Sequence, residues 1–271
     1  MPNITGETKL LALIGSPVSH SLSPRIHNRF AESLGLPYAY MAFDVVSDGL
    51  ERFTDAARLM AIAGFNVTMP LKESIIPYLD TVGPEARNAV NTVVNKDGAL
   101  YGYNTDGGGF VFSLERERFS LMGKRVLILG AGGAAKAVAS ALVREGAFVR
   151  MASRVPNREV EVEGAKYCHW KDIEIEAAGQ NLLVNATPLG MQGVDGDFSD
   201  LSFLRTLAPD AVVYDLIYSP RETKLLKAAG ENGFHTINGI SHLVCQAAMS
   251  FELFTGYAPS GKIVDGLLNT I

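Results

Sequence analysis

The chain has 271 residues, of which 47% are apolar and 20% charged, so it can bury a globular core and is long enough for two α/β domains. The net charge of −5 argues against nucleic acid or an anionic membrane as the main partner. Its two cysteines, Cys168 and Cys245, lie far apart and argue against a disulfide scaffold, and we expect no metal site. The chain shows no secretory pattern and no apolar stretch of membrane-spanning length, so we expect a cytoplasmic protein.

The first part of the chain alternates segments typical of strands and of helices. We expect strands over residues 9–15, 38–45 and 64–69, and helices over 24–34 and 48–62. Ser23 is the expected N-cap of the first helix, with Pro24 at its first position. This alternation predicts βαβ units and a mostly parallel sheet.

A turn signal follows, and then a second series of alternating segments. Asp97-Gly98 separates two β-rich runs, which predicts a hairpin over 92–103, with a helix over 109–118 after it. Further strands are expected over 125–129, 148–152, 182–185, 211–215 and 236–237, and helices over 134–145, 224–232, 241–255 and 261–268.

These segments predict an α/β fold of two domains, a mostly parallel α/β domain followed by a Rossmann-type domain. Residues 1–106 are expected to form the first domain and residues 107–240 the second. The helices from about 241–271 have no strand after them, and we expect them to pack back toward the first domain.

A glycine-rich turn stands between the strand over 125–129 and the helix after it, and reads Gly130-Ala131-Gly132-Gly133-Ala134-Ala135. Gly130 permits a tight turn, Gly132 permits close approach of a pyrophosphate, and Ala135 permits close packing of helix on strand. The amides at the start of the helix attract phosphates. Small residues also serve plain helix packing, but the strand before and the helix after favour a dinucleotide site.

The end of the next strand indicates which dinucleotide is bound. NAD sites usually place an acidic residue there to bind the ribose 2′-hydroxyl. This chain has Ser153, Arg154 and Arg158 in that region and no carboxylate at the expected place. Two arginines and a hydroxyl suit a 2′-phosphate, so the sequence predicts NADP rather than NAD. The alternative is that the arginines are solvated loop charges.

Polar clusters follow the strands of the first domain, and open α/β sheets bind ligands beyond their strand ends. Ser21 and Ser23 precede a helix whose N-terminus suits a carboxylate, although Ser23 also fits a plain capping role. Asn66 and Thr68 lie two residues apart, so a strand presents both on one face. Lys72, at the start of an expected helix, suits proton transfer, although an isolated lysine is more often a surface group.

Two further clusters contain Asn91 and Asp106. Asp106 stands at the end of a predicted strand before three glycines, an unusual place for a solvated carboxylate. Together with Lys72 it is a candidate for a functional ion pair. His27, near the first cluster, is expected to pack or cap rather than to catalyse.

The ordered motifs resemble those of the shikimate dehydrogenase family over nearly the whole chain. The motifs are the serine-rich segment over 15–28, Asn66-Val67-Thr68-Met69-Pro70-Leu71-Lys72, Gly102-Tyr103-Asn104-Thr105-Asp106, Asn185-Ala186-Thr187-Pro188-Leu189-Gly190-Met191, Asp215-Leu216-Ile217-Tyr218-Ser219-Pro220 with Thr223, and Asn238-Gly239 followed by Gln246. The resemblance implies reversible reduction of 3-dehydroshikimate to shikimate by NADPH, in aromatic amino-acid biosynthesis.

The resemblance also implies a role for each matching residue. It makes Lys72 and Asp106 the catalytic pair and gives Ser21 and Ser23 the substrate carboxylate. The implied contacts to the ring hydroxyls and their surroundings are Asn66, Lys72, Asn91, Asp106 and Gln246, with Thr68 and Tyr218 nearby. The residues implied on the nicotinamide side are Thr187, Leu216 and Gly239.

The chain departs from the family pattern at a few positions. His242 stands where methionine is frequent, and Ser153-Arg154-Val155 stands where asparagine, arginine and threonine are frequent. Two alternatives to an NADP-dependent shikimate dehydrogenase therefore stay open. One is a paralogue that oxidises quinate or an analogue with NAD or NADP, and the other is a non-catalytic NADP-binding regulator. The protein is expected to be a monomer or a homodimer.

Overall fold

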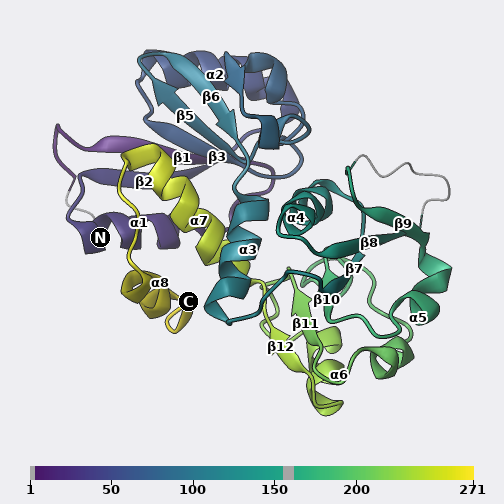
Figure 1. The fold of residues 1–271 in the computed structure, drawn as a ribbon. Coiled ribbons are helices and arrows are strands. Elements are labelled where there is room, and N and C mark those ends of the chain that lie inside the picture. The colour runs from purple at the N-terminus through teal and green to yellow at the C-terminus, as the bar shows by residue number, and fades with distance from the viewer. Residues whose placement is uncertain (1–3, 155–161) are drawn as a thin grey trace. The chain divides into compact units, whose positions relative to one another are not determined.

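The computed structural model describes residues 4–154 and 162–271. The chain divides into two compact units, one made of the residues up to Gly109 together with Val244–Ile271, and the other of Phe110–Leu243. Each unit is built around its own six-stranded sheet (Figure 1). The predicted fold class is confirmed. Within the described ranges no helix is long and apolar enough to cross a membrane.

The sheet of the first unit combines parallel and antiparallel strands. They are β1 (Lys9–Gly15), β2 (Tyr38–Asp44), β3 (Gly64–Val67), β4 (Thr81–Val82), β5 (Thr92–Lys96) and β6 (Ala99–Tyr103). Their order is β2-β1-β3-β5-β6-β4, with β1 parallel to β2 and β3, and β5 antiparallel to β3 and β6. The crossover helices of the parallel part are α1 (Ser23–Leu34) and α2 (Leu50–Leu59). Because β1 and β3 are parallel, the loops at their carboxyl ends lie together.

The predicted hairpin forms with β5 and β6. Asp97 and Gly98 both have positive φ, 52° and 89°, which is the backbone of a two-residue turn that matches the twist of the strands. Gly98 N–H donates to Asn95 Oδ1 over 2.9 Å and closes the turn.

β2 lies at one edge of this sheet in the part of the chain that the structure describes. The side chain of Asn28, on α1, donates from Nδ2 to Tyr40 O over 2.9 Å and accepts the Tyr40 N–H at Oδ1 over 2.8 Å. Both backbone groups of Tyr40 that face away from β1 are therefore hydrogen-bonded by one amide.

The second unit holds an all-parallel sheet. Its strands are β7 (Arg125–Leu129), β8 (Phe148–Ser153), β9 (Lys166–His169), β10 (Leu182–Asn185), β11 (Val212–Asp215) and β12 (His235–Ile237). They lie in the order β12-β11-β10-β7-β8-β9, so the chain starts in the middle, moves to one side and then to the other. This is the order of a Rossmann fold, and its switch point lies between β7 and β10. The α-helices that connect these strands are α4 (Gly133–Arg144), α5 (Ile173–Glu176) and α6 (Lys224–Glu231).

Three more helices complete the chain: α3 (Asp106–Arg116), α7 (Ile240–Thr255) and α8 (Gly261–Leu268). The division between the units falls inside α3 and inside α7. α8 packs on α1, where Arg25 Nη2 donates to the carbonyl of Thr270 over 2.8 Å. This contact ties the end of the chain to the first helix.

The structure corrects three local expectations. Ser23 is not the N-cap, because Leu22 holds that position in helical conformation and no side chain caps α1. The helix expected directly after Pro70 does not form; residues 70–75 make turns that lead into a 3-10 turn, Ile76–Tyr78. α3 begins at Asp106 rather than at residue 109, so Asp106 opens a helix. The short strands β4 and β9 and helix α5 lacked a periodic pattern and were missed.

The glycines after Asp106 permit close packing of α3 on α7. A Cβ at Gly109 would lie 2.5 Å from Gln246 Cα, and one at Gly108 would lie 2.6 Å from Met249 Cε. The contact at Gly109 is with backbone, which cannot rotate away as a flexible side chain can. Gly109 therefore fixes the place of Gln246 beside the start of α3.

We expect Gly109→Ala to lower the free energy of unfolding by about 1–3 kcal/mol, because α3 and α7 must move apart. Gly266→Ala is the matched control: a Cβ there meets no described atom within 4 Å, so the substitution should add about 0.5–1 kcal/mol through helix propensity. Urea unfolding of both variants measures the two effects. Equal effects in both would contradict the packing argument.

Candidate active site

The predicted catalytic pair is formed within the first unit. Lys72 Nζ lies 2.6 Å from Asp106 Oδ2, and the two side chains are 21% and 8% exposed. Lys72 comes from the turn after β3, and its backbone carbonyl accepts the N–H of Val90 over 2.8 Å. The turn is thereby fixed beside the residues that precede β5, which include Asn91. A charged pair that is mostly buried at strand ends is typical of a reactive site.

Asn91 holds the other oxygen of Asp106. Its Nδ2 donates to Asp106 Oδ1 over 2.7 Å, and its Oδ1 accepts the backbone N–H of Thr105 over 2.8 Å and the hydroxyl of Thr92 over 2.9 Å. A backbone N–H can only donate, so the amide orientation of Asn91 is determined. Asp106 therefore receives donors on both oxygens, which suits a carboxylate.

The amide of Asn66 is hydrogen-bonded inside the protein. Its Oδ1 accepts the Tyr40 hydroxyl over 2.8 Å, and its Nδ2 donates to Asn91 O, Thr92 Oγ1 and Ser250 Oγ over 3.0–3.1 Å. Asn66 thus joins three strands of the sheet to α7. Gln246, one turn before Ser250 on α7, lies near the same cluster, with Thr105 Oγ1 donating to its Oε1 over 3.4 Å.

Of the hydroxyl residues of the first predicted cluster, Ser21 lies in the loop between β1 and α1, and Ser23 is the first residue of α1. Ser23 is buried and Ser21 is partly buried, and Ser21 Oγ accepts the N–H of Ser23 over 3.2 Å. Thr68 follows β3, and its N–H donates to Ile14 O over 2.9 Å. The N–H of Ser16 donates to Met69 O over 3.1 Å, so the loops that carry the serines and Thr68 are in contact.

His27, on α1 after this cluster, packs as expected. Its ring stacks on Tyr40 with centroids 4.2 Å apart, and its Nδ1 has no hydrogen-bond partner among the described residues. Burial lowers the pKa of His27 to about 3, because desolvation disfavours the charged ring. His27 is therefore neutral in the folded protein at ordinary pH.

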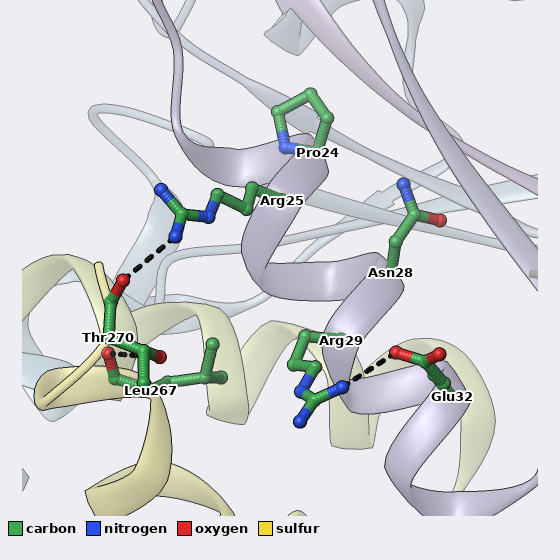
Figure 2. Close-up of a pocket in the computed structure, with 7 residues that line it drawn as sticks. All are labelled: Pro24, Arg25, Asn28, Arg29, Glu32, Leu267 and Thr270. Atoms are coloured by element: carbon green, nitrogen blue, oxygen red, sulfur yellow. Dashed lines mark hydrogen bonds and ion pairs between the residues drawn. The ribbon is translucent and has the colours of Figure 1, made fainter. Parts of the chain in front are cut away.

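The pocket drawn in Figure 2 lies elsewhere in the first unit, between α1 and α8. Its arginines are engaged: Arg25 bonds Thr270 O, and Arg29 Nη1 lies 2.9 Å from Glu32 Oε2. None of the predicted site residues lines this pocket. Its walls therefore serve the packing of the C-terminal helix on α1 rather than proton transfer.

The glycine loop of the second unit has the geometry that a pyrophosphate requires. Gly130 has φ 116°, and a Cβ there would lie 3.1 Å from Ala186 O. At Gly132, which precedes α4, a Cβ would meet no atom of the described residues within 4 Å. The first turn of α4 reads Gly133-Ala134-Ala135-Lys136, with no acidic side chain to oppose an anion. These residues therefore fit a dinucleotide phosphate at the switch point of the sheet.

Ser153 and Arg154 follow directly along β8, the neighbour of β7. Ser153 is buried at the last position of the strand, and Arg154 is exposed just after it. Arg158 lies outside the described residues.

The other predicted cofactor residues gather at the carboxyl ends of β10, β11 and β12. Thr187 follows β10, Leu216 follows β11, and Gly239 follows β12. A Cβ at Gly239 would lie 2.1 Å from Leu216 O, so only glycine fits there.

Tyr218 is partly buried in the loop after β11, where desolvation raises the pKa of its hydroxyl. His242 packs its ring edgewise on Phe110, with centroids 6.1 Å apart.

Sequence reasoning does not identify Asp215 as a functional residue, although it lies in one of the family motifs. Asp215 is fully buried at the end of β11, and desolvation raises its pKa to about 6 against the opposing effect of its hydrogen bonds. Its position at the end of a buried strand is the sequence feature that could have indicated it.

Among the described residues no group of three His, Cys, Asp or Glu side chains could hold a metal ion.

The fold and the two sites define a class: an oxidoreductase with a Rossmann-type dinucleotide-binding unit and an α/β unit that carries a lysine–aspartate pair. Residues 13–93 match the family described as the shikimate dehydrogenase substrate binding domain. The NADP(+) shikimate dehydrogenase of Carboxydothermus hydrogenoformans is 41% identical, and 96% of each chain is covered. The chain belongs to the shikimate dehydrogenase family.

Solved structures show the same likeness. A Thermus thermophilus shikimate 5-dehydrogenase, solved with NADP(H) and shikimate, has a TM-score of 0.86 at 35% identity, covering 97% of this chain and 99% of that one. A Listeria monocytogenes shikimate 5-dehydrogenase, solved with shikimate and NAD, has a TM-score of 0.85 at 33% identity, covering 99% of both.

Acid should destabilise the protein through His27. The unfolded chain binds a proton at this residue below about pH 6.5, whereas the folded protein does not until about pH 3, so stability is lost as pH falls through this window. At pH 5 the loss amounts to about 2 kcal/mol. We expect His27→Phe to lose about 2 kcal/mol less than the native protein between pH 7 and pH 5 in urea unfolding. The exposed His20 is the control, and His20→Phe should leave the native pH dependence unchanged.

Proposed function

We propose that the protein catalyses the reversible reduction of 3-dehydroshikimate to shikimate with NADPH. The observation that carries the proposal is the contact of Lys72 Nζ with Asp106 Oδ2 over 2.6 Å, in a unit that matches the substrate binding domain of the family. Both residues of the pair are in place, which argues against a non-catalytic regulator.

Lys72 is the proton donor in this proposal. Reduction of a ketone builds negative charge on its oxygen, and a cationic donor at that oxygen stabilises the charge and supplies the proton. NADPH, when bound, supplies the hydride. Asp106 orients the Lys72 ammonium and can accept a hydrogen bond from a substrate hydroxyl. In the oxidation of shikimate, Lys72 in its neutral form accepts the hydroxyl proton.

The other polar residues hold the substrate in the proposal. Ser21, just before α1, and Ser23, its first residue, bind the substrate carboxylate. Thr68, Asn91 and Gln246 contact the substrate hydroxyls. Tyr218 is also included among the proposed substrate contacts. The family resemblance gives Asn66 a contact to the substrate; its amide bonds Tyr40, Asn91, Thr92 and Ser250, so we propose that it also supports the neighbouring site residues through the sheet.

NADP is the proposed cofactor. The glycine loop Gly130–Ala135 and the first turn of α4 would hold its pyrophosphate, and Ser153, Arg154 and Arg158 would hold the 2′-phosphate. Thr187, Leu216 and Gly239 would line the nicotinamide end. The Listeria relative was solved with NAD, so NAD is the second cofactor to be assayed.

One steady-state experiment tests the function: shikimate and quinate, each assayed with NADP and with NAD. We expect the highest kcat/KM for shikimate with NADP. Faster turnover of quinate with NAD would instead support the paralogue.

Lys72→Ala should lower kcat by about 100- to 10,000-fold, because the proton donor is lost, with little change in shikimate affinity. The measurement is kcat together with the Kd of shikimate. Lys96→Ala, at an exposed lysine of the β5–β6 hairpin, is the control and should keep native turnover. Near-native turnover of Lys72→Ala would overturn the catalytic assignment.

The double variant Arg154→Gln, Arg158→Gln should weaken NADPH binding about tenfold or more and leave NADH binding nearly unchanged, because only NADPH carries the 2′-phosphate. Titration of each cofactor gives the two Kd values. Arg144→Gln, at the end of α4, is the control. An equal loss for both cofactors would argue against 2′-phosphate recognition.

A further inference from the structure

Asp215 is a buried carboxylate at the end of β11 that has no part in the proposed proton transfer or binding contacts. Three donors surround it: Asn185 Nδ2 and the N–H of Ile217 each lie 3.0 Å from Oδ1, and the Thr223 hydroxyl lies 2.7 Å from Oδ2. All three partners donate hydrogen bonds, and an ionised carboxylate only accepts them, so these surroundings suit Asp215 in its ionised form. The side chain is 0% exposed.

The first contact determines how Asn185 presents its amide. Since Asn185 Nδ2 is held by Asp215, its Oδ1 points the other way and accepts the N–H of Thr187 over 3.0 Å and its hydroxyl over 2.7 Å. Thr187 Oγ1 in turn accepts the N–H of Leu189 over 3.2 Å. The backbone and side chain of Thr187 are thereby fixed through Asn185.

The second contact shapes the chain after β11. The N–H of Ile217 reaches back to Asp215, which forms a tight turn around Leu216. The carbonyl of Leu216 then lies where a Cβ at Gly239 would be, and Gly239 N–H donates to Ile217 O over 3.1 Å. Leu216 and Gly239 are therefore placed together by the same carboxylate that fixes Thr187.

We propose that Asp215 is a positioning residue that sets the nicotinamide end of the cofactor site by holding Asn185 and Ile217. It acts on Thr187, Leu216 and Gly239 without touching the substrate or the cofactor. The inference rests on the proposed function, because those three residues are assigned to the nicotinamide there. It adds Asp215 to the residues on which the reaction depends. It also explains how the carboxyl ends of β10, β11 and β12 are held in a fixed arrangement.

Hydride transfer depends steeply on the distance between the two carbons, so a small displacement of the nicotinamide lowers kcat strongly. In the proposal, the glycine loop and the residues after β8 hold the opposite end of the cofactor, and the hydrogen bonds of Asp215 go instead to Asn185, Ile217 and Thr223. A positioning defect should therefore lower kcat more than it weakens cofactor binding.

The test compares Asp215→Ala with Asp215→Asn. Alanine removes the acceptor for Asn185 and Ile217, and we expect kcat to fall about tenfold or more, with the Kd of NADP+ changed less than about threefold. The primary isotope effect on kcat, measured with shikimate deuterated at the hydride-donating carbon, should rise. Asparagine keeps one acceptor oxygen at Oδ1 and should retain kcat within about threefold of native.

Leu204→Ala is the control for stability alone. Leu204 is fully buried in the core of the same unit and belongs to none of the proposed sites. This variant should lose stability but keep the native kcat and isotope effect. An equal fall of kcat in Leu204→Ala and Asp215→Ala would overturn the positioning role, as would an asparagine variant as impaired as alanine.

Amide hydrogen exchange of the cofactor-free protein gives a readout that is independent of turnover. In Asp215→Ala the amides of Thr187 and Ile217 should exchange faster, while those of Leu127 and Val184 inside the sheet keep their native protection. Unchanged protection of Thr187 and Ile217 would refute the inference even in an active enzyme. Failure of the proposed function is distinguishable, because it shows as absent activity of the native protein with shikimate and NADP+.

Discussion

Asn91 has its amide fixed from both sides, and the first unit's site depends on that constraint. The N–H of Thr105 can bond only to an acceptor, so it selects the oxygen of Asn91 and turns the nitrogen toward Asp106. Asp106 is then aligned for Lys72 on its second oxygen. A rotated amide would place two acceptors against each other and leave the carboxylate without one of its donors. The backbone that leads into α3 thus decides the orientation of a side-chain pair.

Asn185 shows the same principle in the second unit. There a buried carboxylate, rather than a backbone amide, selects the nitrogen, and the oxygen is turned toward Thr187. Asn91 lies just before β5 and Asn185 is the last residue of β10, and in each unit the asparagine has one amide group fixed by a partner, so its other amide group positions a second residue. Such chains of bonds are strong inside a protein because few solvent molecules compete for the same groups.

Most of the fold could be predicted from the sequence because its signals are local. The alternation of apolar strands with amphipathic helices predicted the sheets, and Asp97-Gly98 predicted the hairpin turn. The helix expected after Pro70 did not form, since tertiary contacts such as Val90 with Lys72 hold that segment in a turn. Ser23 is not the cap, because the chain enters α1 already in helical conformation at Leu22.

The residues of the candidate site could be predicted from the sequence, but the hydrogen bonds that hold them in place could be predicted less well. Lys72, Asn91 and Asp106 were found from their positions after strands, and the structure brings them together. Two of the hydrogen-bond partners of Asn66, Tyr40 and Ser250, lie 26 and 184 residues away along the chain, so no local pattern indicates them. Asp215 was missed because the partner that links it to Thr187 is Asn185 on β10, which lies 30 residues away along the chain.

The contact of Asn28 with β2 has a consequence for the protein at high concentration. An edge strand offers unpaired backbone groups to any extended chain that approaches, which is how sheets of different molecules fuse into aggregates. At Tyr40 the backbone N–H and carbonyl are not available for such pairing, because the side chain of Asn28 hydrogen-bonds both of them as a neighbouring strand would. A second molecule can add a strand there only by breaking these two bonds, so the edge is protected by the same helix that carries His27.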